Sequence, residues 1–286
     1  MIRILKYFIQ AILVYCFFLI SKLIGLTLSR KFSSFIFKTI GPFVKSKKIV
    51  NKNLQNLPIK ISDLQKKEII KNMWSNYGMT FVEYVFLNKF KKGNLHISIK
   101  GEEILDKILK NNKPVIFVSG HFANFELMSM EITKRNIKLA TIYRPLNNFF
   151  LDSFMLFLRK KYICKNQIKK GRSGLKDAIN FIQKNHSIAL MIDQRLSEGE
   201  SINFFNKKAL TTTLPAQLAL KYNLEIIPIF IERNSKDLFE IEIMHPINVM
   251  KINSKFEITK KLNQILEDMI TKKPDQWIWT HNRWKK

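Results

Sequence analysis

The feature that most constrains the fold is an alternation, between residues 96 and 243, of short apolar runs with stretches of helical period. Runs of this kind are typical of buried strands, and the periodic stretches between them are typical of amphipathic helices. Strands that alternate with helices form α/β sheets, because each helix buries its apolar side against the sheet. We expect strands at 96–99, 115–118, 139–143, 162–164, 188–192, 225–232 and 238–243, and helices at 102–110, 123–135, 149–160, 175–184 and 213–222.

The last two expected strands are separated only by residues 234–237, so they should pair as an antiparallel hairpin. A hairpin added to strands that are otherwise joined through helices makes the sheet mixed. The sequence therefore predicts an α/β fold with a mixed central β-sheet flanked by helices.

Residues 115–126 read VIFVSGHFANFE, an apolar run followed by a Ser-Gly turn that delivers His121 and, five residues later, Glu126. On one continuous helix these two side chains would lie roughly 140° apart, so they can meet only if His121 sits in the turn. A carboxylate beside an imidazole fixes its tautomer and stabilises the imidazolium that forms when it takes a proton from a hydroxyl. We take His121 and Glu126 as candidate catalytic residues, with Glu126 orienting the imidazole. The alternative is that Glu126 only favours the helix N-terminus.

Three polar residues follow expected strands: His121, Arg144 and Asp193. Ligands bind α/β sheets at the carboxyl ends of the strands, so these side chains should converge on one edge. Arg144, and Arg172 before a later helix, suit phosphates or sugar acids, which a planar guanidinium binds through two hydrogen bonds. Asp193 can accept hydrogen bonds from hydroxyl groups of a ligand or from a partner arginine. Solvated arginines and a loop-capping aspartate are the structural alternatives.

The N-terminal segment is apolar and begins and ends with basic residues. A helix over residues 4–28 would be about 37 Å long, enough to reach across a ~30 Å hydrocarbon core if tilted, with Lys22 snorkelling. A signal peptide is the rival interpretation, but Arg30-Lys31 ends the run and no small-residue cleavage site follows. Because the uncharged core covers only residues 7–21, a helix lying in the membrane interface remains open. We therefore expect an N-terminal membrane-anchoring helix.

Two more segments bear on the membrane and the core. Residues 32–44 are apolar and aromatic, and the basic run 45–48 after them could lie on anionic headgroups or simply be solvated. Residues 62–87 begin with a Ser62 cap and continue with a helical period, so that helix must pack on an apolar surface. We divide the chain into an anchor, residues 1–31, and one catalytic domain, residues 32–286.

The composition limits the partners. Lys and Arg number 49 against 22 Asp and Glu, a net charge of +27 that suggests an anionic partner, although the chain is rich in lysine throughout. No nucleic-acid-binding motif accompanies the charge, so we expect no nucleic acid. Cys16 and Cys164 are the only cysteines, and no histidine forms a metal-ligand spacing, so neither a disulfide nor a metal nor another cofactor is expected.

Taken in order, these features resemble the bacterial lipid A biosynthesis acyltransferases, within the lysophospholipid acyltransferase superfamily. The resemblance spans most of the chain. It is carried by the N-terminal apolar segment, His121-Phe122-Ala123-Asn124-Phe125-Glu126, Tyr143-Arg144-Pro145, Gly171-Arg172, Ile192-Asp193-Gln194 and the ending Trp279-x-His281-x-Arg283-Trp284. In the ending, His281 is expected to pack between the two tryptophans, or the aromatic residues are expected to lie at the membrane interface.

The resemblance implies an O-acyltransferase that moves a fatty acyl chain from an acyl-carrier-protein thioester to a hydroxyl of a lipid A precursor. His121 would deprotonate that hydroxyl, and Arg159 is the first candidate to stabilise the oxyanion, with main-chain N–H groups near His121 as the alternative. The implied partners are the acyl carrier protein, a phosphorylated glycolipid acceptor and an anionic membrane. The implied place is the cytoplasmic face of the bacterial inner membrane. A relative acting on another glycolipid or a lysophospholipid, and a catalytically silent lipid-binding protein, remain alternatives.

Overall fold

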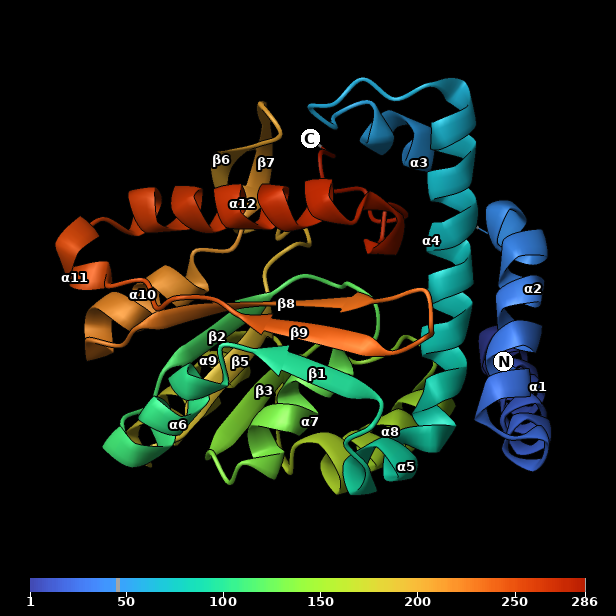
Figure 1. Cartoon of the computed structure of the whole chain (residues 1–286), viewed down its shortest axis with the longest axis horizontal. Helices are drawn as coiled ribbons and strands as arrows, with labels where there is room; N and C mark the ends of the chain where they lie inside the picture. Colours follow the sequence, from blue (N-terminus) through green and yellow to red (C-terminus); the bar gives the residue numbers. More distant parts are fainter. Residues whose placement is uncertain (45–46, 286) are drawn as a thin grey trace.

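The central element is a seven-stranded mixed sheet with strand order β1-β9-β8-β2-β5-β3-β4 (Figure 1). The computed structural model describes residues 1–44 and 47–285, without the side chains of Val44 and Arg172. The expected basic surface at 45–48 therefore falls in part, at residues 45 and 46, outside the described residues. The strands are β1 (Ile97–Lys100), β2 (Ile116–Ser119), β3 (Leu139–Tyr143), β4 (Asn166–Lys169), β5 (Ser187–Met191), β8 (Ile226–Arg233) and β9 (Phe239–Ile243).

The pairing confirms the expected α/β architecture. Strands β8, β2, β5, β3 and β4 are parallel neighbours, whereas β9 pairs antiparallel with β8, as the short 234–237 connection predicts. All four residues of β2 are buried, because a parallel sheet is covered on both faces and its central strands are apolar throughout. The flanking helices include α6 (Glu102–Asn111), α7 (Glu126–Lys134), α8 (Phe149–Leu158), α9 (Arg172–Gln183), α10 (Leu214–Tyr222), α11 (Val249–Ile252) and α12 (Lys255–Lys272).

Two expectations in this region were wrong in detail, and one hairpin was not expected. Helix α7 begins at Glu126 rather than at residue 123, because Ala123 adopts a left-handed conformation with φ 40° and cannot continue a helix. A π-helical turn, η2 (Arg159–Ile163), occupies the place of the short strand expected at 162–164, and the edge strand β4 follows it. A hairpin that was not expected, β6 (Glu200–Phe204) and β7 (Lys207–Thr211), forms a separate two-stranded sheet.

The N-terminal segment forms two helices instead of the single expected one. Helix α1 (Ile2–Ile24) is long and apolar enough to cross a membrane, and it ends at Gly25, whose φ of 81° suits glycine. Helix α2 (Leu26–Val44) follows and runs beside the long helix α4 (Asp63–Glu83), as Figure 1 shows. Ser62 caps α4 through a reciprocal pair of hydrogen bonds with Gln65, which confirms the predicted start. The remaining short elements are α3 (Lys47–Leu54), η1 (Tyr84–Phe86), α5 (Leu87–Lys92) and η3 (Pro274–Gln276).

Two basic residues of this segment, Lys22 and Arg30, make polar contacts with the rest of the protein. The Lys22 ammonium donates to the Val85 carbonyl at 2.8 Å, so it does not snorkel as expected. Arg30, expected to end the membrane segment, is buried and pairs with the fully buried Glu83 of α4 at 2.6 Å. Helices α1 and α2 are therefore held against α4 and η1 by specific polar contacts as well as by apolar packing.

Candidate active site

The site is built where two neighbouring parallel strands end. In the pairing of β2 with β5, Ser119 lies opposite Met191, so the residues two positions further along, His121 and Asp193, leave the sheet side by side. His121 Nδ1 lies 2.8 Å from Asp193 Oδ1, and the His121 main-chain N–H donates to Asp193 Oδ2, also at 2.8 Å. The Trp277 indole N–H donates to the same Oδ2 at 2.9 Å. Asp193 thus holds both the ring and the backbone of His121.

The electrostatics of this pair favour an ionised carboxylate beside a basic imidazole. Burial by itself raises the pKa of Asp193, but His121 and the Trp277 N–H lower it on balance to about 2. Burial by itself lowers the pKa of His121, but Asp193 raises it on balance above its usual value, with a smaller contribution from the Glu126 charge. An ionised Asp193 can only accept, so Nδ1 carries the proton and Nε2 is left as the basic nitrogen.

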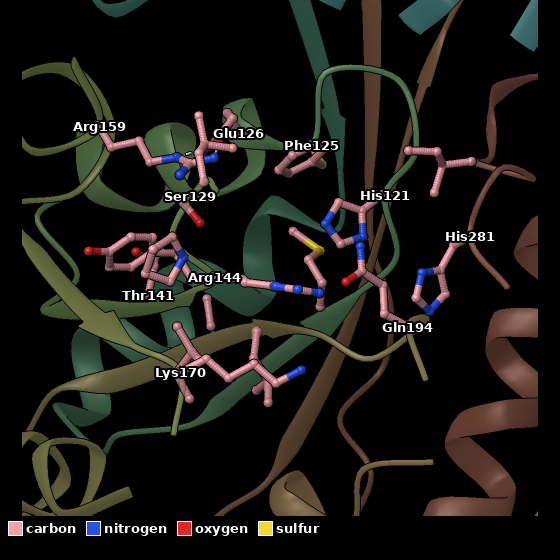
Figure 2. A pocket seen from close by; sticks show the side chains of 18 of the residues that line it. His121, Phe125, Glu126, Ser129, Thr141, Arg144, Arg159, Lys170, Gln194 and His281 are labelled. Carbon is pink, nitrogen blue, oxygen red and sulfur yellow. Dashed lines mark hydrogen bonds and ion pairs between the residues drawn. The ribbon is translucent and has the colours of Figure 1, made fainter. Parts of the chain in front are cut away.

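Glu126 occupies a different place from the one expected. Its Oε1 accepts a hydrogen bond from the Tyr84 hydroxyl and pairs with the Arg159 guanidinium, whose Nε lies 2.7 Å away. Figure 2 shows Glu126 beside Arg159 and Phe125 between Glu126 and His121 in this view. The Phe125 ring packs edge-on against the imidazole, with centroids 4.7 Å apart. Glu126 therefore does not hold the imidazole as expected: Asp193 accepts the hydrogen bond from His121 Nδ1, because strand pairing brings Asp193 closer than the helix start brings Glu126.

The turn that carries His121 is fixed from two sides. A side chain at Gly120 would place its Cβ 2.8 Å from the Phe122 ring, so the close approach there requires glycine. The left-handed Ala123 is held by its N–H, which donates to the Gln276 carbonyl at 3.3 Å, and by its carbonyl, which accepts from the Thr80 hydroxyl at 2.9 Å. Non-glycine residues in this conformation persist only where their surroundings determine them.

His121 faces a cleft of about 1180 Å³ that has an apolar wall and a polar wall. Met73, Tyr77 and Phe81, at a spacing of four along α4, contribute to the apolar wall, which confirms that this helix packs on an apolar interior. Arg144 and Lys170 stand on the polar wall, and Figure 2 shows both extending into the space beside His121. A cleft with these two walls is suited to an amphiphile whose polar part carries negative charge.

The arginines singled out from the sequence differ in their surroundings. Arg159 is mostly buried, and both Glu126 and Tyr84 bind it, so its charge is already compensated and it is not free for an oxyanion. Arg144 is exposed at the cleft and makes no hydrogen bond or ion pair within the part of the chain that the structure describes. The side chain of Arg172 lies outside the described side chains, and only its backbone, at the start of α9, can be placed.

Sequence reasoning missed three contributors to the site. Tyr84 and Trp277 are ordinary core aromatics by pattern, and only their polar ends, bonded to Glu126 and Asp193, reveal their function. His281 does not simply buttress the tail: it lines the cleft, and its Nε2 accepts the Arg195 main-chain N–H at 2.9 Å. Burial lowers the pKa of His281 to about 4, so the ring is neutral near pH 7.

The aromatic tail lies inside the protein and not at a membrane interface. Trp277 and Trp279 are 1% and 0% exposed, and Arg283, also fully buried, donates to the Leu210 carbonyl at 2.7 Å. Trp284 donates to the Phe204 carbonyl at 3.0 Å. The Trp-x-His-x-Arg-Trp ending therefore fastens the β6–β7 hairpin beside the cleft.

A histidine held by a buried carboxylate, with its basic nitrogen at an amphiphilic cleft, defines an enzyme that can deprotonate a hydroxyl for group transfer. A family model described as bacterial lipid A biosynthesis acyltransferase matches residues 1–286, and the chain belongs to this family. The expected family and the acyltransferase class are confirmed.

Several curated relatives agree with this assignment. The chain is 24% identical to the lipid A biosynthesis acyltransferase 2 of Shigella flexneri over 228 residues, which cover 76% of this chain and 71% of that protein. It is 21% identical to the lipid A biosynthesis lauroyltransferase of Escherichia coli K12 over 245 residues, 83% of this chain and 78% of that protein. It is 19% identical to the myristoyltransferase of the same organism over 223 residues, 76% of this chain and 68% of that protein. Because these relatives are named for different acyl groups, membership does not fix the chain that is transferred.

Proposed function

We propose that this acyltransferase moves a fatty acyl chain from the thioester of an acyl carrier protein to a hydroxyl of a lipid A precursor, as a late secondary acylation of lipid A. The observation that carries the proposal is the 2.8 Å contact between His121 Nδ1 and Asp193, which leaves Nε2 basic at the mouth of a cleft of about 1180 Å³. An alcohol is a weak nucleophile, and a positioned base of this kind is what its activation requires.

In the proposed reaction, the acceptor hydroxyl oxygen attacks the thioester carbonyl carbon while His121 Nε2 takes the hydroxyl proton. The tetrahedral intermediate then expels the carrier thiolate: the carbon–sulfur bond breaks, and the imidazolium returns the proton to sulfur. Asp193 stabilises the imidazolium through its hydrogen bond, and the charge of Glu126 also favours it, opposed in part by the charge of Arg159, so both carboxylates belong to the proposed catalytic set. Arg159 supports Glu126 by pairing with it.

The oxyanion of the intermediate requires a hydrogen-bond donor. His281 is a neutral ring on the cleft wall whose Nε2 already accepts the Arg195 N–H, so its other nitrogen carries a proton that it can donate. We assign the oxyanion to His281 in place of Arg159.

Phosphates of the acceptor are assigned to Arg144 and Arg172. The guanidinium of Arg144 at the cleft, which has no partner among the described residues, supports its part of the assignment, because charge-assisted bonds to phosphate are strong. The net charge of +27 suits both a phosphorylated glycolipid and an acidic carrier protein. An Arg144→Ala variant should raise the KM for a phosphorylated acceptor about tenfold and leave the KM for the donor unchanged.

Helix α1 is proposed to lie along the cytoplasmic leaflet of the inner membrane instead of crossing it. The Asn148 amide donates to the Tyr7 carbonyl at 2.8 Å, and the Tyr15 hydroxyl donates to the Phe150 carbonyl at 2.7 Å. With the Lys22 contact near the far end, these bonds hold most of the helix against the catalytic domain. The opposite face exposes apolar side chains to the lipid: Ile2, Leu5, Ile9, Ile12, Leu13, Leu19, Ile20 and Leu23. The division into an anchor, 1–31, and a catalytic domain, 32–286, stays a proposal, although α2 continues across residue 31.

Mass spectrometry of lipid A tests the function. Cells that carry the protein should contain lipid A species one acyl chain heavier than cells that lack it, and a His121→Ala variant should not restore them. An unchanged lipid A profile in both strains would contradict the proposal, and transfer in vitro to a lysophospholipid in preference to lipid A precursors would favour the alternative acceptor.

A further inference from the structure

A second polar cluster lies behind the catalytic turn, and the proposed reaction does not use it. Its centre is Glu83, whose side chain is fully buried near the end of α4. Arg233 of β8 donates to both of its oxygens, at 2.6 and 3.0 Å, and Arg30 of α2 donates to Oε1 at 2.6 Å. The fourth donor is the Asn124 amide, at 2.9 Å from Oε2. One carboxylate thus joins the N-terminal helices, the sheet and the turn that carries His121.

A buried cluster of this kind is weak evidence of stabilisation by itself. Burying three charged groups in one place loses their hydration, and well-packed apolar residues would often hold the same elements together as well. Burial by itself raises the pKa of Glu83, but Arg233 and Arg30 lower it on balance, so the carboxylate stays ionised. An ionised, fully buried acceptor fixes the direction of each of its donors, which an apolar contact does not do.

Of the donors to Glu83, the Asn124 amide is the one that belongs to the turn carrying His121. This residue lies between the left-handed Ala123 and the ring of Phe125 that packs on His121. Thr80, one turn before Glu83 on α4, binds the Ala123 carbonyl at 2.9 Å. Helix α4 therefore holds the turn at two consecutive residues, and Arg30 ties α2 to the same carboxylate that holds Asn124.

We propose that Glu83 is a positioning residue, which through Asn124 holds the catalytic turn and through Arg30 makes its geometry depend on the docking of α2. The docking of the N-terminal helices then sets the alignment of His121 with Asp193. The inference rests on the proposed function only for its kinetic consequences, because the coupling itself is a property of the fold.

Hydrogen–deuterium exchange on the full chain in phospholipid nanodiscs tests the coupling without any activity. Arg30→Met keeps the Glu83–Arg233 pair intact, and we expect it to speed exchange in the 120–126 segment by about threefold or more. Lys31→Met is the matched control, since it removes the same charge from the neighbouring, exposed position on α2. Equal exchange in the two variants would overturn the link to α2.

Kinetics test the positioning. Asn124→Ala should lower kcat about tenfold to a hundredfold with little change in either KM, because a small displacement of a catalytic group is costly. The turn would also hold His121 less firmly against Asp193, so the acid limb of the pH profile should move to lower pH. A normal kcat, or a reduced kcat with an unmoved limb, would overturn the proposal, since loss of folded protein alone does not move the limb. If the wild-type protein transfers no acyl chain, the proposed function fails, whereas the exchange experiment still decides the coupling.

Discussion

Asp193→Asn separates the role of Asp193 from that of Glu126 most directly. The substitution keeps the size of the side chain and removes its charge. The fall of the Asp193 pKa from 3.8 to about 2 corresponds to a favourable interaction of on the order of 2 kcal/mol, because one pKa unit is about 1.4 kcal/mol. If that interaction also stabilises the imidazolium in the transition state, its loss lowers kcat roughly thirtyfold. An asparagine amide that donates to Nδ1 would also impose the wrong tautomer, which extends the expected loss towards about 10⁴-fold.

The pH profile gives the sign of the effect. His121 acts as a base only when it is neutral, so the rate rises with pH through its pKa, which Asp193 places above the ordinary value of about 6.5. In Asp193→Asn the carboxylate no longer raises the pKa of His121, so the rising limb of the pH profile should move to lower pH, and the maximal rate should fall. Initial rates at saturating donor and acceptor over a pH series measure both quantities, and Asp177→Asn, the same change on the exposed face of α9, is the control. A plateau close to wild type with an unmoved limb would refute the assignment of Asp193.

Two further predictions concern the charge beside the site and the membrane. Glu126→Gln leaves the Arg159 guanidinium uncompensated, so the free energy of unfolding should fall by about 1–3 kcal/mol. The acid limb of the pH profile should move less than in Asp193→Asn, because Glu126 has no bond to the imidazole. A larger movement in the same pH series would show that Glu126 is the partner of His121. In a variant without Cys16, single cysteines placed at Lys6 and Lys31, exposed positions near the two ends of the segment and outside its lipid-facing set, should both react with an impermeant maleimide on inside-out vesicles. Cys164 will not interfere, because burial raises the pKa of its thiol to about 11. Reaction at one end only would show that the helix crosses the membrane.

Periodicity was a good guide wherever one element could satisfy its own requirements. The apolar run of β2, the Ser62 cap of α4 and the close antiparallel return of β9 are all determined by nearby residues, and the structure contains each of them. The expected convergence of His121, Arg144 and Asp193 also holds, because parallel strands send their carboxyl ends to one edge. Local sequence was misleading at Ala123, where contacts from α4 and the C-terminal tail impose a left-handed conformation.

The sequence alone establishes the α/β class, the apolar N-terminal helix and a candidate catalytic histidine with acidic residues near it. It could not decide which acid holds the imidazole. Glu126 is nearer along the chain, but side chains at a helix start are directed by their own helix, whereas Asp193, 72 residues away, is brought alongside by the register of β2 on β5. The same limit applies to Arg30. Along the sequence Arg30 ends an apolar run, whereas in the structure it pairs with the buried carboxylate of Glu83, behind the turn that carries His121. Strand order and helix docking come from the burial of the whole core, so these partners meet only in the folded chain.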